Sequence, residues 1–432
     1  MKKRRYIKLL AAALSLTLLA TACANNSGSG GGSDGDTVVI GSTFTLSGDV
    51  AHAGQMAFEG AELAVKYVNE ELGGINGKQV ELKYYDDEFD ESKIPMLYER
   101  LITQDKVDLL LSPYTSPFLA AAPVVNKYDE LMFCVAADSY SANEEFGQSI
   151  VNIQMDSQWK GGRWWKDVME FFVNFDEWNT DPSLEAPKTM AILNLEIAYG
   201  HEIEEAVVPY LQENGIEVVY NEYFDPMETD WTPVVSQLKE MQPDIVFCPH
   251  YFEGSVNFVE TCVELDYSAD YMIVEGMSWD PISWPNQEAG GLNPSIAKRG
   301  MFGYSVYKAE GYESDTKEYL AAYAKEKYNS IPGNDLLCGF MAVELAAKAA
   351  NIAGSTEKDA LIKALTENTF TLAGYEYTMD ESGGNGADFS WGVGQFIPED
   401  INSADSSGDD WYCVWPEQYA NHEPYYPFHG WS

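Results

Sequence analysis

The chain has 432 residues, a formal net charge of −43, 45% hydrophobic residues and 13% aromatic residues. A charge this negative argues against duplex nucleic acid as a partner, because binding the phosphate backbone requires basic surface. The hydrophobic and aromatic content is typical of a folded chain rather than a disordered acidic tail. The length exceeds what one hydrophobic core normally serves, so we expect two domains.

The N-terminus has the features of an export signal. Lys2–Arg5 are basic, and Leu9–Ala20 form an apolar segment that is too short to span a membrane. The sequence L-A-T-A-C, which ends at Cys23, resembles a bacterial lipobox. We therefore expect a signal peptide over residues 1–22, a lipid anchor on Cys23 and a flexible Gly/Ser-rich linker over residues 23–36. The alternative is ordinary secretion with an incidental cysteine. We expect no later segment to span a membrane.

The first elements after the linker predict a strand, a helix and a second strand. Thr37–Ile40 is a β-branched run typical of a buried strand, and Gly41–Gly54 is rich in small polar residues typical of a loop. From Met56 onward, apolar residues recur at helical spacing until Gly73. Val80–Tyr85 alternates as a second strand. In such sheets, ligands bind at the carboxyl ends of the strands.

Four motifs in this segment resemble a known family. They are G-x-x-x-x-x-S-G at Gly41–Gly48, F-x-G-A-x-L-A at Phe58–Ala64, G-G-I-N-G at Gly73–Gly77 and Y-D-D at Tyr85–Asp87. In this order they resemble the type I periplasmic binding proteins of the branched-chain amino acid ABC transporter family, in lipoprotein form. The resemblance implies an α/β fold of two doubly wound lobes with parallel sheets and several crossover strands. The alternative is another doubly wound α/β domain with a similar start.

The remaining chain alternates predicted strands with predicted helices, as parallel α/β sheets do. A loop is expected at Ser112–Pro117, an amphipathic helix from Asp156, and a polar surface insertion at 174–187. The further predicted strands lie at 107–111, 131–135, 189–195, 216–223, 244–248 and 271–274. The two successive series of elements predict an N-terminal lobe of residues 37–157 plus 308–391. They predict a C-terminal lobe of residues 158–307 plus 392–432.

The resemblance places a ligand carboxylate near the loop at 112–116. Hydroxyls and amide groups at a helix start bind anions, so Thr115 and Ser116 are the candidate residues; the alternative is that they only cap the helix. Ala136 and Asp138 follow the next strand. The family commonly has a threonine at the position of Asp138, so the aspartate is a departure that favours a cation or indicates another ligand class. The alternative for Asp138 is an exposed turn residue.

Three further candidates lie in the second lobe. By the resemblance, Tyr199 covers the ligand, Tyr251 contacts it, and Glu275 receives its ammonium group. A buried carboxylate is costly unless it is paired, and a bound ammonium group would supply the pair. The alternatives are packing of Tyr199 between helices and a salt bridge of Glu275 within its lobe. Trp159, Trp279 and His52 lie near the expected cleft, although most of the tryptophans are expected in the core.

The sequence therefore predicts an extracellular solute-binding lipoprotein of an ABC importer. Its partners would be a small zwitterionic ligand, either an amino acid or a related amine or amide, and a membrane-embedded permease. We expect a monomer without enzymatic activity, cofactor, metal site or nucleic-acid partner, because nucleophile motifs, phosphate loops and metal-ligand spacings do not occur. The alternative is a ligand-sensing lipoprotein, or a binder of amides, amines or aromatic acids, that feeds a separate receptor.

Overall fold

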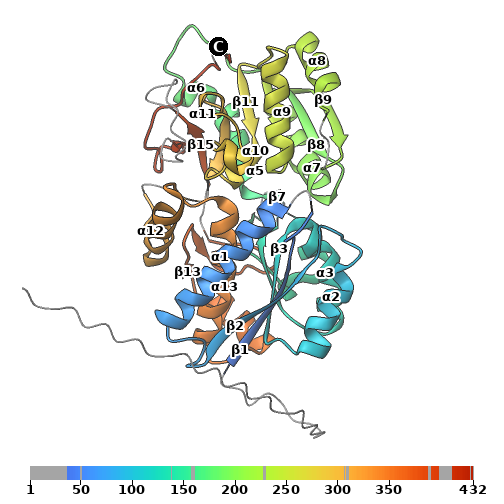
Figure 1. The fold of residues 1–432 in the computed structure, drawn as a ribbon, viewed down its shortest axis with the longest axis vertical. Helices are drawn as coiled ribbons and strands as arrows, with labels where there is room; N and C mark the ends of the chain where they lie inside the picture. The colour runs from blue at the N-terminus through green and yellow to red at the C-terminus, as the bar shows by residue number, and fades with distance from the viewer. Residues whose placement is uncertain are drawn as a thin grey trace, which may run out of the picture. The chain divides into compact units, whose positions relative to one another are not determined.

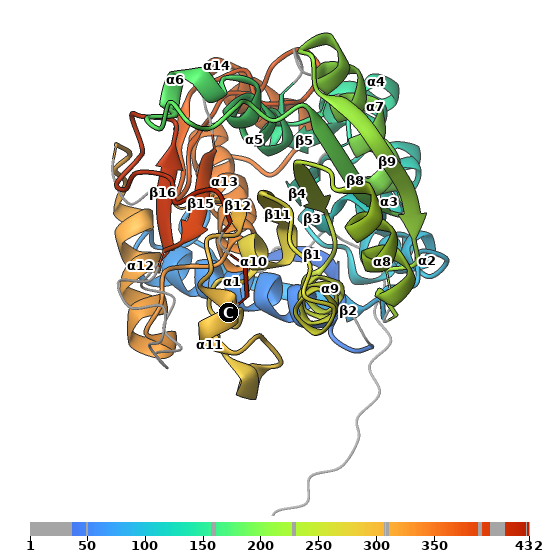
Figure 2. The same cartoon turned by 90° about the horizontal axis from the view of Figure 1, so that it is seen from above.

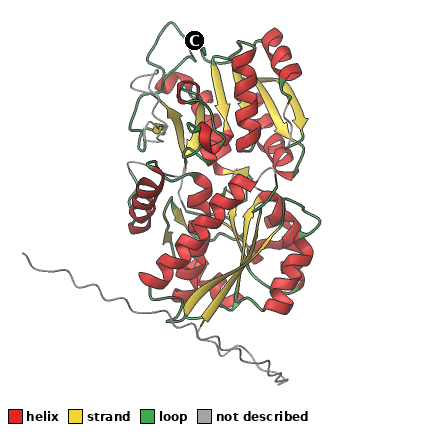
Figure 3. Ribbon diagram, viewed as in Figure 1, coloured by secondary structure: helices red, strands yellow, loops and turns green. Residues whose placement is uncertain are grey.

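A computed structural model describes residues 37–48, 51–137, 139–156, 161–226, 230–305, 307, 311–387, 391–397, 411–428 and 430–431. The predicted signal peptide, Cys23, the linker, Asp138 and Trp159 lie outside these residues. Residues 36–432 form one compact unit. Two main β-sheets with helices on both faces account for two lobes within it, as the ribbon coloured by secondary structure shows (Figure 3). The predicted α/β fold class is confirmed.

The first sheet has five parallel strands in the order β2-β1-β3-β4-β5. The strands are β1 (Thr37–Phe44), β2 (Gln79–Asp86), β3 (Leu109–Tyr114), β4 (Met132–Ala136) and β5 (Ile150–Asn152). Helices α1 (Ala51–Glu70) and α13 (Asn334–Ala353) lie on one face, and α2 (Ile94–Arg100) and α3 (Thr115–Lys127) lie on the other (Figure 1). Leu109 and Leu111 join the core under α1 and α13, whereas Leu110 joins the core under α2 and α3. This alternation is the two-residue period of a strand buried on both faces.

Glycines allow α1 and α13 to pack at very short range. A Cβ added at Gly60 would lie 2.0 Å from the carbonyl oxygen of Leu336, and one added at Gly339 would lie 2.0 Å from that of Ala57. Among the described residues, α13 is the one helix that is long and apolar enough to span a membrane by length and composition. Because most of α13 is buried in the protein, this composition is that of a core helix.

The second sheet has the order β16-β15-β12-β11-β10-β8-β9. The parallel strands are β8 (Thr189–Leu195), β9 (Glu217–Phe224), β10 (Ile245–Cys248), β11 (Tyr271–Val274) and β12 (Phe302–Ser305). Antiparallel strands β15 (Gly392–Phe396) and β16 (Trp411–Trp415) extend its edge. In both sheets the first strand lies between the second and the third. The strand order therefore reverses between β1 and β3 and between β8 and β10, where α/β sheets bind ligands.

Helices cover both faces of the second sheet (Figure 2). Ile192 and Phe247 pack with residues of α5 (Arg163–Val173) and α7 (Ala198–Glu213). Leu193 and Val246 pack with residues of α8 (Thr232–Met241) and α9 (Phe252–Glu264). The shorter or peripheral elements are α4 (Ser141–Phe146), α6 (Phe175–Trp178), α10 (Glu275–Trp279), α11 (Pro294–Ala297), α12 (Asp315–Tyr328), α14 (Lys358–Glu367), β6 (Met155–Asp156), β7 (Gly161–Gly162), β13 (Phe370–Thr371), β14 (Glu376–Tyr377), η1 (Leu101–Asp105), η2 (Gly147–Ser149) and η3 (Gln287–Ala289).

Two predicted loops are shorter than expected. β1 continues to Phe44 and α1 begins at Ala51, so the loop expected over residues 41–54 is wrong at both ends. β3 continues to Tyr114 and α3 begins at the next residue, which removes the loop expected at 112–117. In each case pairing with a neighbouring strand extends the β-structure: Phe44 pairs with Asp86, and Tyr114 pairs with Ala136. Small and polar residues on their own favour a loop, but hydrogen bonding to a neighbouring strand overrides that preference.

Two other expectations also need correction. The helix expected from Asp156 begins only at Arg163, after two short paired strands. The segment at 174–187 is not a purely surface insertion, because Phe175 and Trp178 are buried in the core. The predicted lobe boundaries near residues 157, 307 and 391 stay predictions.

Candidate functional site

A cavity lies at the carboxyl ends of the central strands of both sheets. It encloses about 420 Å³ of empty space, part of which is open to solvent. The first sheet and the helices on it supply the residues Ala53, Tyr114, Thr115, Ala136 and Asp335. The second lobe supplies the residues Tyr199, Tyr251, Phe252, Glu275 and Trp279. Of the residues predicted from sequence, the cavity therefore brings together Thr115, Ala136, Tyr199, Tyr251 and Glu275.

Glu275 is a buried carboxylate with one oxygen engaged and the other not. It is the first residue of α10, directly after β11, and only 2% of it is exposed. Its Oε1 accepts hydrogen bonds from the Tyr199 hydroxyl at 2.5 Å, from Trp279 Nε1 at 2.5 Å and from the Tyr304 hydroxyl at 3.0 Å. Its Oε2 has no partner among the described residues. Burial raises the pKa of Glu275 to about 7, although the three donors oppose the shift.

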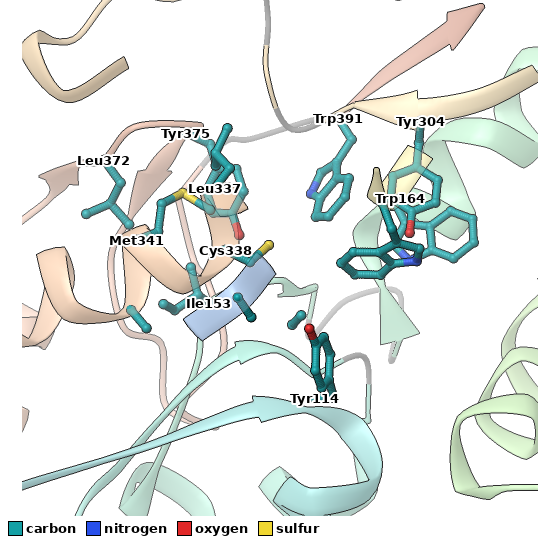
Figure 4. Packing of buried hydrophobic residues seen from close by; sticks show 14 of the residues in the cluster. Tyr114, Ile153, Trp164, Tyr304, Leu337, Cys338, Met341, Leu372, Tyr375 and Trp391 are labelled. Atoms are coloured by element: carbon teal, nitrogen blue, oxygen red, sulfur yellow. The ribbon is translucent and has the colours of Figure 1, made fainter. Parts of the chain in front are cut away.

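An aromatic cluster holds the donors to Glu275 in place. The Tyr304 ring stacks on Trp164 with ring centroids 3.9 Å apart, and the centroid of the Trp391 ring lies 5.1 Å from that of Tyr304 (Figure 4). Trp165 Nε1 donates a hydrogen bond to the Tyr199 hydroxyl at 3.5 Å. These large buried rings have little freedom to move, so they fix the direction in which Glu275 presents its free oxygen.

Asp335 is a second buried carboxylate in the same cavity, and the sequence analysis missed it. It lies in the first turn of α13 and is 1% exposed. The Tyr114 hydroxyl donates to its Oδ1 at 3.1 Å, while Oδ2 has no partner among the described residues. Burial raises the pKa of Asp335 well above its usual value, and the charges of Asp280 and Glu275 add to the rise. The only local signal was the short polar start Gly333-Asn334-Asp335 before an apolar helix.

The first residues of α3 form part of the opposite wall. Thr115 lines the cavity, and the N-cap residue Tyr114 makes no side-chain capping bond. Ser116 is 2% exposed and does not line the cavity, but its hydroxyl has no hydrogen-bond partner within the described residues. A helix start of this kind attracts anions through its amide groups and its dipole. Ala136, at the end of β4, is a small residue that leaves space beside it.

His52 and Asp280 link the two lobes beside the cavity. His52 Nε2 contacts Asp280 Oδ2, and the His52 ring stacks on Phe252 with centroids 4.6 Å apart. Asp280 is held in turn by the backbone amides of Ile282 and Ser283. Burial lowers the pKa of His52, but the bond to Asp280 outweighs it and the net shift is upward. His52 is therefore part of a contact between the two lobes.

The other aromatic candidates divide between the wall and the core. Trp279 lines the cavity as expected for a tryptophan near the cleft, whereas Trp164 and Trp165 are fully buried core residues. The five cysteines of the described residues, Cys134, Cys248, Cys262, Cys338 and Cys413, are all buried. No group of His, Cys, Asp and Glu side chains within the described ranges is arranged to hold a metal ion.

The chain is similar to known periplasmic binding proteins. A family model described as periplasmic binding protein matches residues 37–395. The leucine-, isoleucine-, valine-, threonine- and alanine-binding protein of Pseudomonas aeruginosa is 24% identical over 353 residues, which cover 81% of this chain and 87% of that protein.

Solved structures with the same fold hold different ligands. The branched-chain amino acid transporter substrate binding protein of Streptococcus pneumoniae, in complex with isoleucine, has a TM-score of 0.67 and 17% identity. That match covers 90% of this chain and 100% of the other. A solute binding protein of an ABC transporter from Rhodopseudomonas palustris, in complex with 3,4-dihydroxy benzoic acid, has a TM-score of 0.67 and 21% identity. It covers 83% of this chain and 92% of the other.

Proposed function

The chain belongs to the periplasmic binding protein family of ABC transporter solute-binding proteins, and we propose that it captures a small zwitterion, an amino acid, for an importer. Family membership implies an extracytoplasmic location. In this proposal Glu275 receives the ligand ammonium group, and Thr115 and the amide groups at the start of α3 receive its carboxylate. Closure of the two lobes would enclose the ligand.

The free oxygen of Glu275 is the observation that carries the proposal. An unpaired carboxylate in a buried site costs several kcal/mol unless a cation or a proton compensates it. Three hydrogen-bond donors all bind the other oxygen, so Oε2 is left for a partner that the described residues do not supply. An ammonium group offers the charge and up to three donors, and the aromatic wall of Tyr251 and Trp279 suits a cation next to it.

Binding measurements with matched ligands test the proposal. A thermal-shift screen over the amino acids should identify a ligand, since a ligand at 100 times its Kd adds about 2.7 kcal/mol to the unfolding free energy. Titration calorimetry then compares that amino acid with its N-acetyl derivative, which lacks the ammonium charge, and its methyl ester, which lacks the carboxylate. Both derivatives should bind at least tenfold more weakly. Equal binding of the N-acetyl derivative would contradict the role of Glu275.

An aromatic acid is the second candidate ligand. The aromatic wall of the cavity favours it, as does the similar Rhodopseudomonas palustris protein in complex with 3,4-dihydroxy benzoic acid. A benzoate would use the α3 wall but would leave Glu275 without a cation. The same calorimetry separates the two ligands: tight binding of hydroxybenzoates without binding of amino acids would replace the amino-acid proposal.

We also propose that Cys23 carries a lipid anchor that holds the protein at the membrane through the linker at 23–36. Replacing Cys23 with alanine should release the protein from the membrane fraction into the soluble extracytoplasmic fraction. Cys413→Ala, which removes a cysteine far along the sequence, is the matched control and should stay with membranes. Membrane association of Cys23→Ala would contradict the anchor.

A further inference from the structure

We propose that Asp335 binds a second positive charge on the ligand, so that the ligand is an amino acid with a basic side chain. This inference rests on the proposed amino-acid function and specifies the ligand class. It assigns Glu275 to the α-ammonium group and Asp335 to the cationic end of the side chain.

Asp335 satisfies the same structural conditions as Glu275. It is 1% exposed, lines the cavity, has one oxygen fixed by the Tyr114 hydroxyl at 3.1 Å, and keeps Oδ2 without a partner among the described residues. No ion pair of Asp335 occurs within the described part of the chain, and none of the described residues that line the cavity is a lysine or an arginine. His52, the histidine beside the cavity, is engaged by Asp280.

The fold brings the two acids to one space from different elements. Gly333 precedes α13 and packs so closely against α10 that an added Cβ would lie 2.7 Å from the carbonyl oxygen of Trp279. The next residue, Asn334, donates to the carbonyl oxygen of Tyr304 at 3.4 Å, and the hydroxyl of the same tyrosine donates to Glu275. The start of α13 is therefore docked onto the elements that hold Glu275.

Two buried carboxylates in one cavity cannot both ionise cheaply unless cations lie between them. A ligand with a single ammonium group can pair with one of them and leaves the other to bind a proton. An amino acid with a basic side chain supplies two cations joined by an alkyl chain. The rings of Tyr114, Tyr251 and Trp279 line the same cavity and would contact that chain and its charged end.

A structural role for Asp335 is the competing explanation. An acid in the first turn of a helix is stabilised by the helix dipole without any ligand. Asp315 is also an acid in the first turn of a helix, α12, but it is exposed and does not line this cavity. It therefore offers a matched control for the loss of an acid at a helix start.

The decisive experiment measures lysine, ornithine and arginine against norleucine by titration calorimetry on the chain without its signal peptide. Norleucine matches the lysine side chain but lacks its terminal amine. We expect the best basic ligand to bind at least tenfold more tightly than norleucine. Asp335→Asn should abolish this preference while changing norleucine affinity by less than threefold, and Asp315→Asn should keep the preference.

Four results would overturn the inference. In the unmodified protein, norleucine could bind as tightly as the basic amino acids. That result would contradict the inference even if Asp335→Asn failed to fold, because it needs no variant. A folded Asp335→Asn variant that kept the preference for a basic side chain would do so as well. If only neutral amino acids bound, the role of Asp335 in binding a second cation would be contradicted, but the proposed amino-acid function would stand. If no amino acid bound, the proposed function would be contradicted as well.

Discussion

Among the described residues, each of the two walls of the cavity contributes one buried carboxylate, and the two walls hold it differently. In the second lobe, three side chains donate to Glu275, and the rings of Trp164 and Trp165 pack against two of those donors, Tyr304 and Tyr199. In the first lobe, one tyrosine donates to Asp335. A preorganised group gives up less freedom when a ligand binds. Glu275 is therefore suited to anchor a constant part of the ligand, and Asp335 to respond to a variable part.

Removing the better-held acid should have the largest effect on binding. Breaking a buried charge pair from one side costs about 3–5 kcal/mol, so Glu275→Ala should weaken amino-acid binding by roughly two to three orders of magnitude. Titration calorimetry measures the change. The exposed control Asp315→Asn should bind normally. Near-normal affinity in Glu275→Ala would reverse the comparison and make the aromatic walls the main source of affinity.

The same residue should have the opposite effect on stability. Burial raises the pKa of Glu275 from 4.5 to about 7 in the folded protein. The stability it contributes is therefore fully present below pH 4.5 and is lost as the pH rises through 7. At pH 8, the free energy of unfolding of the ligand-free Glu275→Gln variant should be up to roughly 3 kcal/mol higher than that of the unmodified protein. Denaturant unfolding at pH 5 and pH 8 checks this. An equal or lower stability of the variant at pH 8 would show that Glu275 is already compensated.

Loss of the Thr115 hydroxyl from the first-lobe wall should weaken binding less than loss of the Glu275 carboxylate. Thr115→Ala should weaken binding by about 1–2 kcal/mol, because the amide groups of α3 remain to bind a carboxylate. Thr115→Ser, which keeps the hydroxyl, should restore most of the affinity in the same calorimetric assay. A loss as large as that of Glu275→Ala would mean that the two walls contribute equally.

The pH dependence of binding should report the charge on Glu275. Between pH 8 and pH 6 the ionised fraction of a group with a pKa of about 7 falls roughly tenfold, so affinity for an ammonium ligand should fall by up to about tenfold. Calorimetry across this range should show the fall in the unmodified protein and in Thr115→Ala, but not in Glu275→Gln. A flat profile for the unmodified protein would indicate a neutral partner for Glu275.

Local patterns were sufficient for many elements because their signals lie within a few residues. The β-branched and aromatic run at Tyr271–Val274 predicts a strand, and the structure has β11 at those residues. The polar residues that follow predicted strands, such as Thr115, Tyr199 and Glu275, do line one cavity. Parallel strands end at the same edge of a sheet, so a residue just after a strand is placed by the order of the chain itself.

The sequence by itself therefore determined the two-lobed α/β fold, the family and most of the cavity wall. Only the tertiary structure decided where the strands at Phe44 and Tyr114 end, because pairing with neighbouring strands sets those ends. It also decided that Asp335 lies in the cavity, since the close packing of α13 against α1 and α10 carries the start of α13 there. That placement depends on contacts between segments that are tens to hundreds of residues apart, which no local pattern around Asp335 encodes.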